Sequence, residues 1–173
     1  MWPFMRQLVA MAATPLVRSK SKMTAAVPSL LKVSDTLHNR RRFTEGEVAA
    51  YVGVSGDRNP VHMDDAFARD VGGFEHGRVV HGMLVASLFP ALIAAHFPGA
   101  VYARQTLKFV APVYVGEEVL VEVEALTIRA TTTTKYIVRF ATKCFTGGDG
   151  VSSLAIDGEA MVVLPSLHLK VDN

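Results

Sequence analysis

Apolar and polar positions follow different patterns in the two halves of the chain. After Gly99, apolar residues either alternate with polar ones or run through β-branched residues. A period of two places successive side chains on opposite faces of a strand, so this half is predicted to form half-buried strands. A shorter apolar stretch, Leu30–Leu37, is a candidate first strand. Four long strands are predicted after it, and their short connections favour antiparallel pairing: Val101–Ala111, Glu118–Ala130, Thr134–Phe145 and Leu154–Leu164.

The region between these strands carries helix signals. Thr44 can cap a helix, and Glu47, three residues later, can reach back to it; this capping box predicts a helix that ends near Val54. Asp64–Val71 is a second short candidate helix. The residues between the two helices are dense in turn formers and predict an ordered loop.

The run from Gly82 to Phe97 is apolar on every face, and a helix of that kind must be buried. Pro90 lies within this run and lacks a backbone N–H, so we expect a kink or a break there. One antiparallel sheet wrapped around one buried helix satisfies this order of elements. The predicted fold class is therefore α+β.

Charge divides the chain into two unlike parts. Residues 1–42 hold eight basic side chains and one acidic one, a net charge of +7, whereas residues 43–173 hold ten basic and fifteen acidic ones, a net charge of −5. An acid-free, basic and weakly amphipathic start is typical of an organelle transit peptide. We expect residues 1–34 to be a mitochondrial transit peptide, with a cleavage site that the sequence leaves open between Met23 and Asp35, and residues 35–173 to form one domain. A chloroplast address and a disordered tail are the alternatives for the first segment.

Composition disfavours several classes of partner. The longest apolar stretch, residues 82–95, is shorter than the roughly 20 residues that span a bilayer, so we expect no membrane insertion. Cys144 is the single cysteine, so no intramolecular disulfide can form. The basic cluster Arg40–Arg42 lacks the clustered aromatic residues of nucleic-acid surfaces, so no nucleic-acid partner is expected. This cluster can instead hold a phosphate or an acidic carrier protein, or it is a solvated patch.

One loop brings three polar side chains close together in sequence. Asp57, Asn59 and His62 fall within six residues, and Pro60 restricts the backbone between them. A histidine can take or give a proton near neutral pH, and a carboxylate beside it can orient water. The alternative is that Asp57 and Asn59 only form the turn while His62 lies at the edge of the core.

A second candidate site is the glycine that opens the buried helix. The N–H groups in the first turn of a helix lack intrahelical partners and lie at the positive end of its dipole, so they can stabilise an oxyanion. Gly82 has no side chain to block the approach of a substrate. The alternative is that Gly82 only permits close packing, with His81 as a capping residue.

Together the two sites resemble a known family. Tyr51–Asp64 (YVGVSGDRNPVHMD), followed by Val80–Leu84 (VHGML), closely resembles the MaoC-like (R)-specific enoyl thioester hydratases, whose motif is a Ser-Gly-Asp-x-Asn-Pro-x-His loop. Phe109–Glu117 (FVAPVYVGE) is similar to that family's strand and Pro-Val-x-x-Gly turn. The resemblance covers residues 30 to 165, approximately.

The resemblance implies a hotdog fold, in which an antiparallel sheet wraps a long central helix, and homodimers with sites at the subunit interface. Asp57 and His62 match the catalytic pair, and Asn59 matches the residue that helps to orient them. Gly82 matches the backbone N–H that binds the thioester carbonyl, with Met83 beside it in the substrate-binding set. No metal and no cofactor are expected. The remaining histidines show no metal-ligand spacing: His38, His76, His96 and His168.

The implied activity is that of a hydro-lyase on acyl thioesters. With a mitochondrial address, we expect a (3R)-hydroxyacyl-[acyl-carrier-protein] dehydratase of type II fatty acid synthesis in the mitochondrial matrix. A matrix (R)-specific trans-2-enoyl-CoA hydratase is the alternative enzyme, so the substrate is an acyl thioester of either acyl carrier protein or CoA. An alternative of another class is a non-catalytic hotdog module that binds acyl thioesters, which an intact Asp57 and His62 disfavour.

Overall fold

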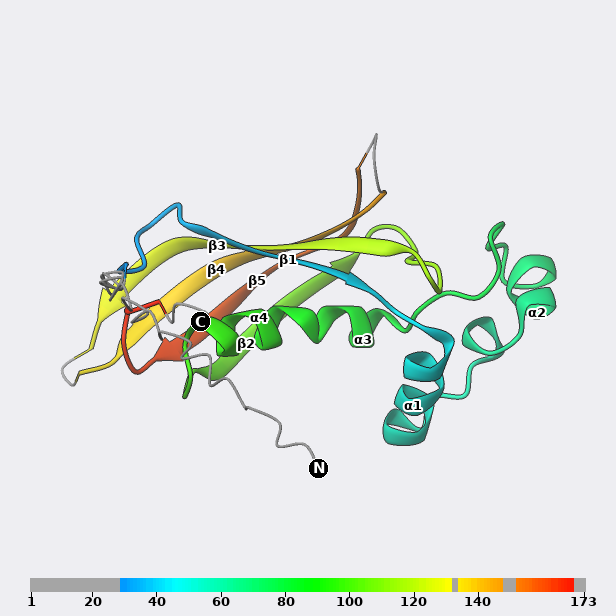
Figure 1. Ribbon diagram of the computed structural model, residues 1–173, viewed down its shortest axis with the longest axis horizontal. Coiled ribbons are helices and arrows are strands. Elements are labelled where there is room, and N and C mark those ends of the chain that lie inside the picture. Colours follow the sequence, from blue (N-terminus) through cyan, green and yellow to red (C-terminus); the bar gives the residue numbers. More distant parts are fainter. Residues whose placement is uncertain (1–28, 132–133, 148–151, 170–173) are drawn as a thin grey trace, which may run out of the picture.

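The computed structural model describes residues 29–131, 134–147 and 152–169, and in these residues five antiparallel strands form one sheet that wraps around a central helix (Figure 1). Most of the expected transit peptide, residues 1–28, lies outside the described residues. The elements in chain order are β1 (Thr36–Arg42), α1 (Glu45–Ser55), the 3-10 helix η1 (Pro60–His62), α2 (Asp65–Asp70), α3 (Gly82–Ala86), α4 (Leu88–His96), β2 (Val101–Phe109), β3 (Glu118–Ala130), β4 (Tyr136–Thr146) and β5 (Ser153–Leu164).

The alternating pattern predicted the inner strands well. The sheet order is β1-β3-β4-β5-β2, with every neighbouring pair antiparallel. On β3, Val119, Val121 and Val123 are fully buried, while alternate residues such as Glu122 and Glu124 are partly exposed. One face of the sheet therefore forms the core. The α+β class and the hotdog arrangement are confirmed.

The first strand lies later in the chain than predicted. We expected it at Leu30–Leu37, but β1 begins at Thr36 and contains the basic cluster. β1 is an edge strand in which Leu37 is the one buried residue. Its sequence therefore lacks the alternation of apolar and polar residues by which the other strands were predicted. Two of its arginines form ion pairs within the chain: Arg40 with Glu118 at 2.9 Å, and Arg41 with Glu47.

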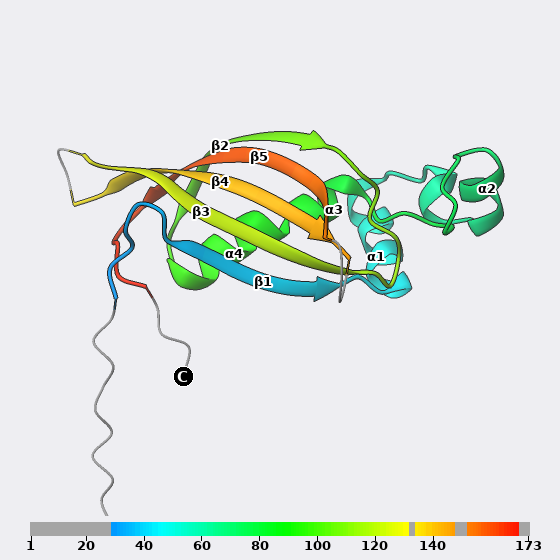
Figure 2. The same cartoon turned by 90° about the horizontal axis from the view of Figure 1, so that it is seen from above.

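The central helix is interrupted as expected. α3 ends at Ala86 and α4 begins at Leu88, and both run along the concave face of the sheet (Figures 1 and 2). Pro90 has no N–H to donate to the carbonyl four residues earlier, at Ala86, and this explains the break. Ser87 occupies it and donates its hydroxyl to the Leu84 carbonyl at 2.6 Å. The buried residues of α4, including Phe89 and Ile93, fill the core.

The helices α1 and α2 extend beyond one end of the sheet (Figure 1). The capping box of α1 is present, because the Thr44 hydroxyl accepts from the Glu47 N–H while the Glu47 carboxylate accepts from the Thr44 N–H. Arg78 joins the two helices by ion pairs to Glu45 of α1 at 2.7 Å and Asp65 of α2 at 3.2 Å. These contacts join the segment that leads into α3 to both of the helices that flank the turn-rich loop.

No helix in the described part of the chain has both the length and the apolar character that crossing a membrane requires.

Candidate active site

The loop between α1 and η1 is built by its own polar side chains. Gly56 ends α1 in the left-handed conformation, at a φ of 74°, which favours glycine. The Ser55 hydroxyl then accepts from the Asp57 N–H, the Asp57 carboxylate from the Asn59 N–H, and the Asn59 side-chain oxygen from the Val61 N–H. These successive turns order the loop, as its composition predicted.

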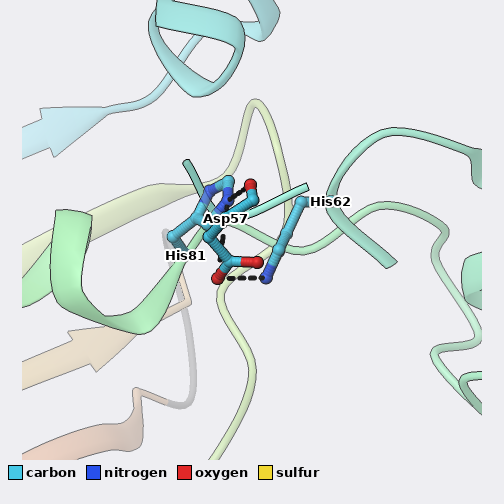
Figure 3. Close-up of side chains that lie close together, drawn as sticks. All are labelled: Asp57, His62 and His81. Atoms are coloured by element: carbon cyan, nitrogen blue, oxygen red, sulfur yellow. Dashed lines mark hydrogen bonds and ion pairs between the residues drawn. The ribbon is translucent and has the colours of Figure 1, made fainter. Parts of the chain in front are cut away.

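His62 lies on η1 and faces Asp57. Its Nδ1 lies 2.7 Å from the Val79 carbonyl oxygen, which can only accept, so Nδ1 carries the proton in the neutral ring. Nε2 then keeps its lone pair and lies 4.0 Å from Oδ2 of Asp57 (Figure 3). The His62 side chain is 12% exposed and that of Asp57 is 51% exposed. The predicted acid–base pair is therefore brought together, with one group sheltered and one open to solvent.

His81 is a third member of this cluster that we did not expect. It is the residue before α3, but its side chain makes no capping hydrogen bond. Its ring stacks on that of His62, with centroids 3.7 Å apart and planes 26° apart, and its Nε2 lies 3.2 Å from the backbone carbonyl oxygen of Asp57 (Figure 3). The side chain is 3% exposed. The one local indication in the sequence that His81 is buried is its place directly after the apolar pair Val79-Val80.

Burial determines the charge of His81. Desolvation lowers the pKa of His81, and the neighbouring His62 acts in the same direction. The hydrogen bond to the backbone of Asp57 and the Asp57 carboxylate, whose Oδ2 lies 4.0 Å from Nε2, oppose the shift but do not cancel it. Because the Asp57 carbonyl can only accept, Nε2 of His81 carries the proton. Nδ1 is buried without a hydrogen-bond partner in the described residues, so a second proton there would have no acceptor. His81 is therefore held in its neutral form.

Gly82 and Met83 form the first turn of α3, beside this cluster. A Cβ added at Gly82 would lie 2.6 Å from the Phe109 ring, so a side chain there would displace that ring. Met83 is 56% exposed. Asn59 uses its side-chain oxygen within the loop rather than toward the other polar groups.

The residues of the site, apart from Asn59, border a cavity of about 460 Å³. Asp57, His62, His81 and Gly82 supply its polar side. Apolar side chains form most of the rest, among them Phe74, Val85, Phe109, Val110, Pro112 and Ile156. A cavity with few polar groups at one side of an apolar lining suits a molecule with a reactive head and an aliphatic chain.

Asp57, His62 and His81 also have side-chain donor atoms within 4.8 Å of one another, close enough to be weighed as metal ligands. Two features of the donor set argue against that use. Nε2 of His81 is committed as a donor to the Asp57 carbonyl. The two stacked rings also hold their lone pairs in separate planes, whereas a metal ion lies in the plane of each imidazole that binds it. The cluster is better suited to moving protons.

The chain is similar in sequence and in structure to proteins that are named as dehydratases and hydratases. Residues 31–143 match the family model described as MaoC like domain. A mitochondrial 3-hydroxyacyl-[acyl-carrier-protein] dehydratase of Arabidopsis thaliana is 49% identical over 150 residues, which are 87% of each chain. An (R)-specific enoyl-CoA hydratase of Aeromonas caviae is 43% identical over 78% of this chain and 96% of that one. The solved structure of an (R)-hydratase from A. caviae matches with a TM-score of 0.69 and 41% identity, over 78% of this chain and 98% of that one.

Proposed function

Because the chain belongs to the MaoC-like domain family, we propose that it is the hydro-lyase that removes water from (3R)-hydroxyacyl-[acyl-carrier-protein] in mitochondrial type II fatty acid synthesis. The observation that carries the proposal is the facing pair of Asp57 and His62 at the polar side of an apolar cavity, in a chain similar over most of its length to a dehydratase of that name. The reaction is reversible, and its product is a trans-2-enoyl thioester.

The proposed mechanism assigns a separate task to each group of the site. The thioester carbonyl accepts a hydrogen bond from the backbone N–H of Gly82, which stabilises the enolate-like charge that grows on the oxygen. In dehydration one member of the pair Asp57 and His62 starts protonated and gives this proton to the hydroxyl that leaves from C3 as water, while the other member takes the proton from C2, so that the pair as a whole neither gains nor loses a proton. Neutral His62 has its free lone pair on Nε2, directed at the same space as the Asp57 carboxylate. In hydration the pair holds the water that adds to C3.

Asn59 and Met83 have supporting tasks in this proposal. Asn59 keeps the spacing of Asp57 and His62 through its hydrogen bond within the loop. Met83 is exposed at the cavity and follows Gly82, so it contacts the substrate beside the thioester. The acyl chain occupies the apolar part of the cavity. None of these steps needs a metal ion or a cofactor.

We place the active protein in a homodimer that pairs through β2. In the described residues both β1 and β2 are edge strands, but β1 is protected by its arginines and their ion pairs. β2 also carries two cations, Arg104 and Lys108, but its two ends expose Val101 and Phe109. Because Phe109 also lines the cavity, a second copy on this edge borders the site.

The proposed compartment is the mitochondrial matrix. Support comes from the acid-free, basic residues 1–34 and from the similarity to a relative that is named mitochondrial. In the matrix the protein would meet the acyl carrier protein of a type II pathway, which the proposed reaction requires.

The test of the proposed function compares two carriers. The same short 3-hydroxyacyl chain is presented on acyl carrier protein and on CoA, and kcat/KM is measured for each. We expect at least a tenfold preference for the carrier protein. Asp57→Asn serves as the matched control and lowers turnover on both by about 10²- to 10⁴-fold, the usual contribution of acid–base catalysis.

Two outcomes contradict the proposal. Equal or better turnover of the CoA ester favours an (R)-specific enoyl-CoA hydratase, the activity for which the A. caviae relative is named. No turnover of either ester by folded wild-type protein favours a non-catalytic module that binds acyl thioesters.

A further inference from the structure

We propose that His81 is a positioning residue that holds both members of the catalytic pair, binding the backbone of Asp57 and supporting the ring of His62 with one neutral imidazole. This inference rests on the proposed function, because it assigns His81 a task in the same reaction. It adds a residue that contacts no substrate atom but determines where the two reacting groups lie.

The first contact of His81 fixes the loop. Its Nε2 lies 3.2 Å from the carbonyl oxygen of Asp57, which is 24 residues away in the chain, and donates its hydrogen to it. Among the described residues, the other hydrogen bonds of Asp57 are to Ser55 and Asn59, within the same loop, so they order the loop without attaching it to the start of α3. The bond from His81 ties Asp57 to the start of α3, where Gly82 lies. The bond thereby keeps the Asp57 carboxylate at a fixed distance and orientation from the oxyanion-binding N–H of Gly82.

The second contact of His81 fixes the plane of His62. The hydrogen bond from Nδ1 to Val79 leaves the His62 ring free to tilt about that bond. A stacked ring with its centroid at 3.7 Å removes this freedom (Figure 3). The Tyr51 ring also packs against His81 in an edge-to-face arrangement, with the two centroids 5.0 Å apart and the planes at 60°. His62 is thus kept with Nε2 toward Asp57.

Neutrality is what allows a second histidine at this position. If His62 takes a proton during the reaction, a charged ring stacked on it would oppose that step. His81 resists protonation because its Nδ1 is buried with no acceptor among the described residues. His81 can therefore lie against His62 without competing with Asp57 for the proton.

Three substitutions separate the two contacts. His81→Gln places an amide N–H near the former Nε2–H, so it can keep the bond to Asp57, but it has no ring. His81→Phe keeps a flat ring and has no donor. His81→Ala removes both. The matched control is His76→Gln, since His76 is an exposed histidine that also packs against an aromatic ring, that of Tyr114 at 4.9 Å.

Positioning predicts a loss in kcat rather than in KM. We expect His81→Ala to lower kcat about 10- to 100-fold, the rate equivalent of a buried hydrogen bond lost from the site, with KM changed less than threefold. His81→Gln and His81→Phe should each lose less than His81→Ala, and His76→Gln should match wild type. Thermal unfolding of each variant accompanies the kinetics.

A spectroscopic measurement tests the same inference without turnover. Nitrogen-15 NMR of the His62 ring should report the Nδ1-protonated tautomer in wild type, and a mixture of tautomers or broadened resonances in His81→Ala. A His81→Ala protein with kcat within twofold of wild type, or with an unchanged His62 spectrum, overturns the proposal. If His81→Ala does not fold, equal kcat in wild type, His81→Gln and His81→Phe overturns it.

The two proposals fail in different ways. Wild-type protein that turns over neither thioester removes the proposed function, and the His62 spectrum then still decides whether His81 positions that ring. Active wild type with an inactive Asp57→Asn variant supports the proposed function whatever the His81 variants do.

Discussion

Phe109 and Gly82 show how one residue limits another at the site. Gly82 begins α3, and Phe109 ends β2, yet the ring of Phe109 occupies the space where a side chain of residue 82 would lie. Phe109 as a residue is 52% exposed and lies outside the buried core, so its side chain can move without disturbing the core. Glycine at this position is therefore needed for the shape of the cavity more than for the stability of the fold.

This coupling predicts the behaviour of Gly82→Ala. The added Cβ should displace the Phe109 ring from the cavity wall and raise KM for the acyl thioester several-fold, while the unfolding temperature changes by only a few degrees. In a Phe109→Ala background the same substitution should have a smaller effect, because the clash is gone. Measured KM values for the four proteins of this double-mutant cycle test the coupling. Additive effects would show that the two residues act independently.

At the level of elements, the caps and breaks of the helices follow from local chemistry. α1 begins where Thr44 and Glu47 complete each other's backbone hydrogen bonds. The central helix breaks before Pro90, where the missing N–H would have bonded to Ala86. The two edge strands differ from the helices in this respect, because whether their free backbone N–H and C=O groups are hydrogen-bonded depends on a partner strand that local sequence does not specify. β2 carries Arg104 and Lys108, but its two ends expose the apolar residues Val101 and Phe109.

An edge strand with exposed apolar residues predicts association through β2. The mass in solution, measured by light scattering, should be that of two chains, and Val101→Lys should shift it toward one chain. Val54→Lys is the matched control, because Val54 is 86% exposed on α1, whereas Val101 is 59% exposed on β2. A monomeric wild type, or a dimer weakened equally by both substitutions, would contradict pairing through this edge.

Over the whole molecule, the near-neutral charge is the sum of two unlike parts. Residues 1–42 carry +7 and residues 43–173 carry −5. Arg40 and Arg41 form ion pairs with two acidic side chains of the domain, and five of the six other basic side chains in residues 1–42 precede β1. The net charge of +2 therefore does not describe the surface that the folded domain presents to a carrier.

The segment before the domain predicts the location of the protein. Residues 1–34 fused to a fluorescent reporter should carry it into mitochondria, because a negative-inside potential draws a basic, acid-free segment across the inner membrane. Replacing Arg6, Arg18, Lys20 and Lys22 by glutamine should leave the reporter in the cytosol. Import of the glutamine variant at the wild-type level would refute a charge-driven address, and a reporter found in chloroplasts would refute the compartment.

Much of this protein is determined by the sequence alone, because the relevant physics is local. The burial alternation along β3, the capping box at Thr44, the break near Pro90 and the ordered loop that carries Asp57 and His62 all follow from residues within one or two turns of each other. The charge division is likewise a property of the chain.

Only the tertiary structure decided the rest, because those features join residues that are far apart in the chain. β1 pairs with β3 as an edge, so its register depended on a partner about 80 residues away rather than on its own pattern. His81 lies against His62 and the backbone of Asp57, and Phe109 lies over Gly82. A sequence displays which side chains are present, but stacking and close approach exist only once the sheet has brought separate segments to the same end of the central helix.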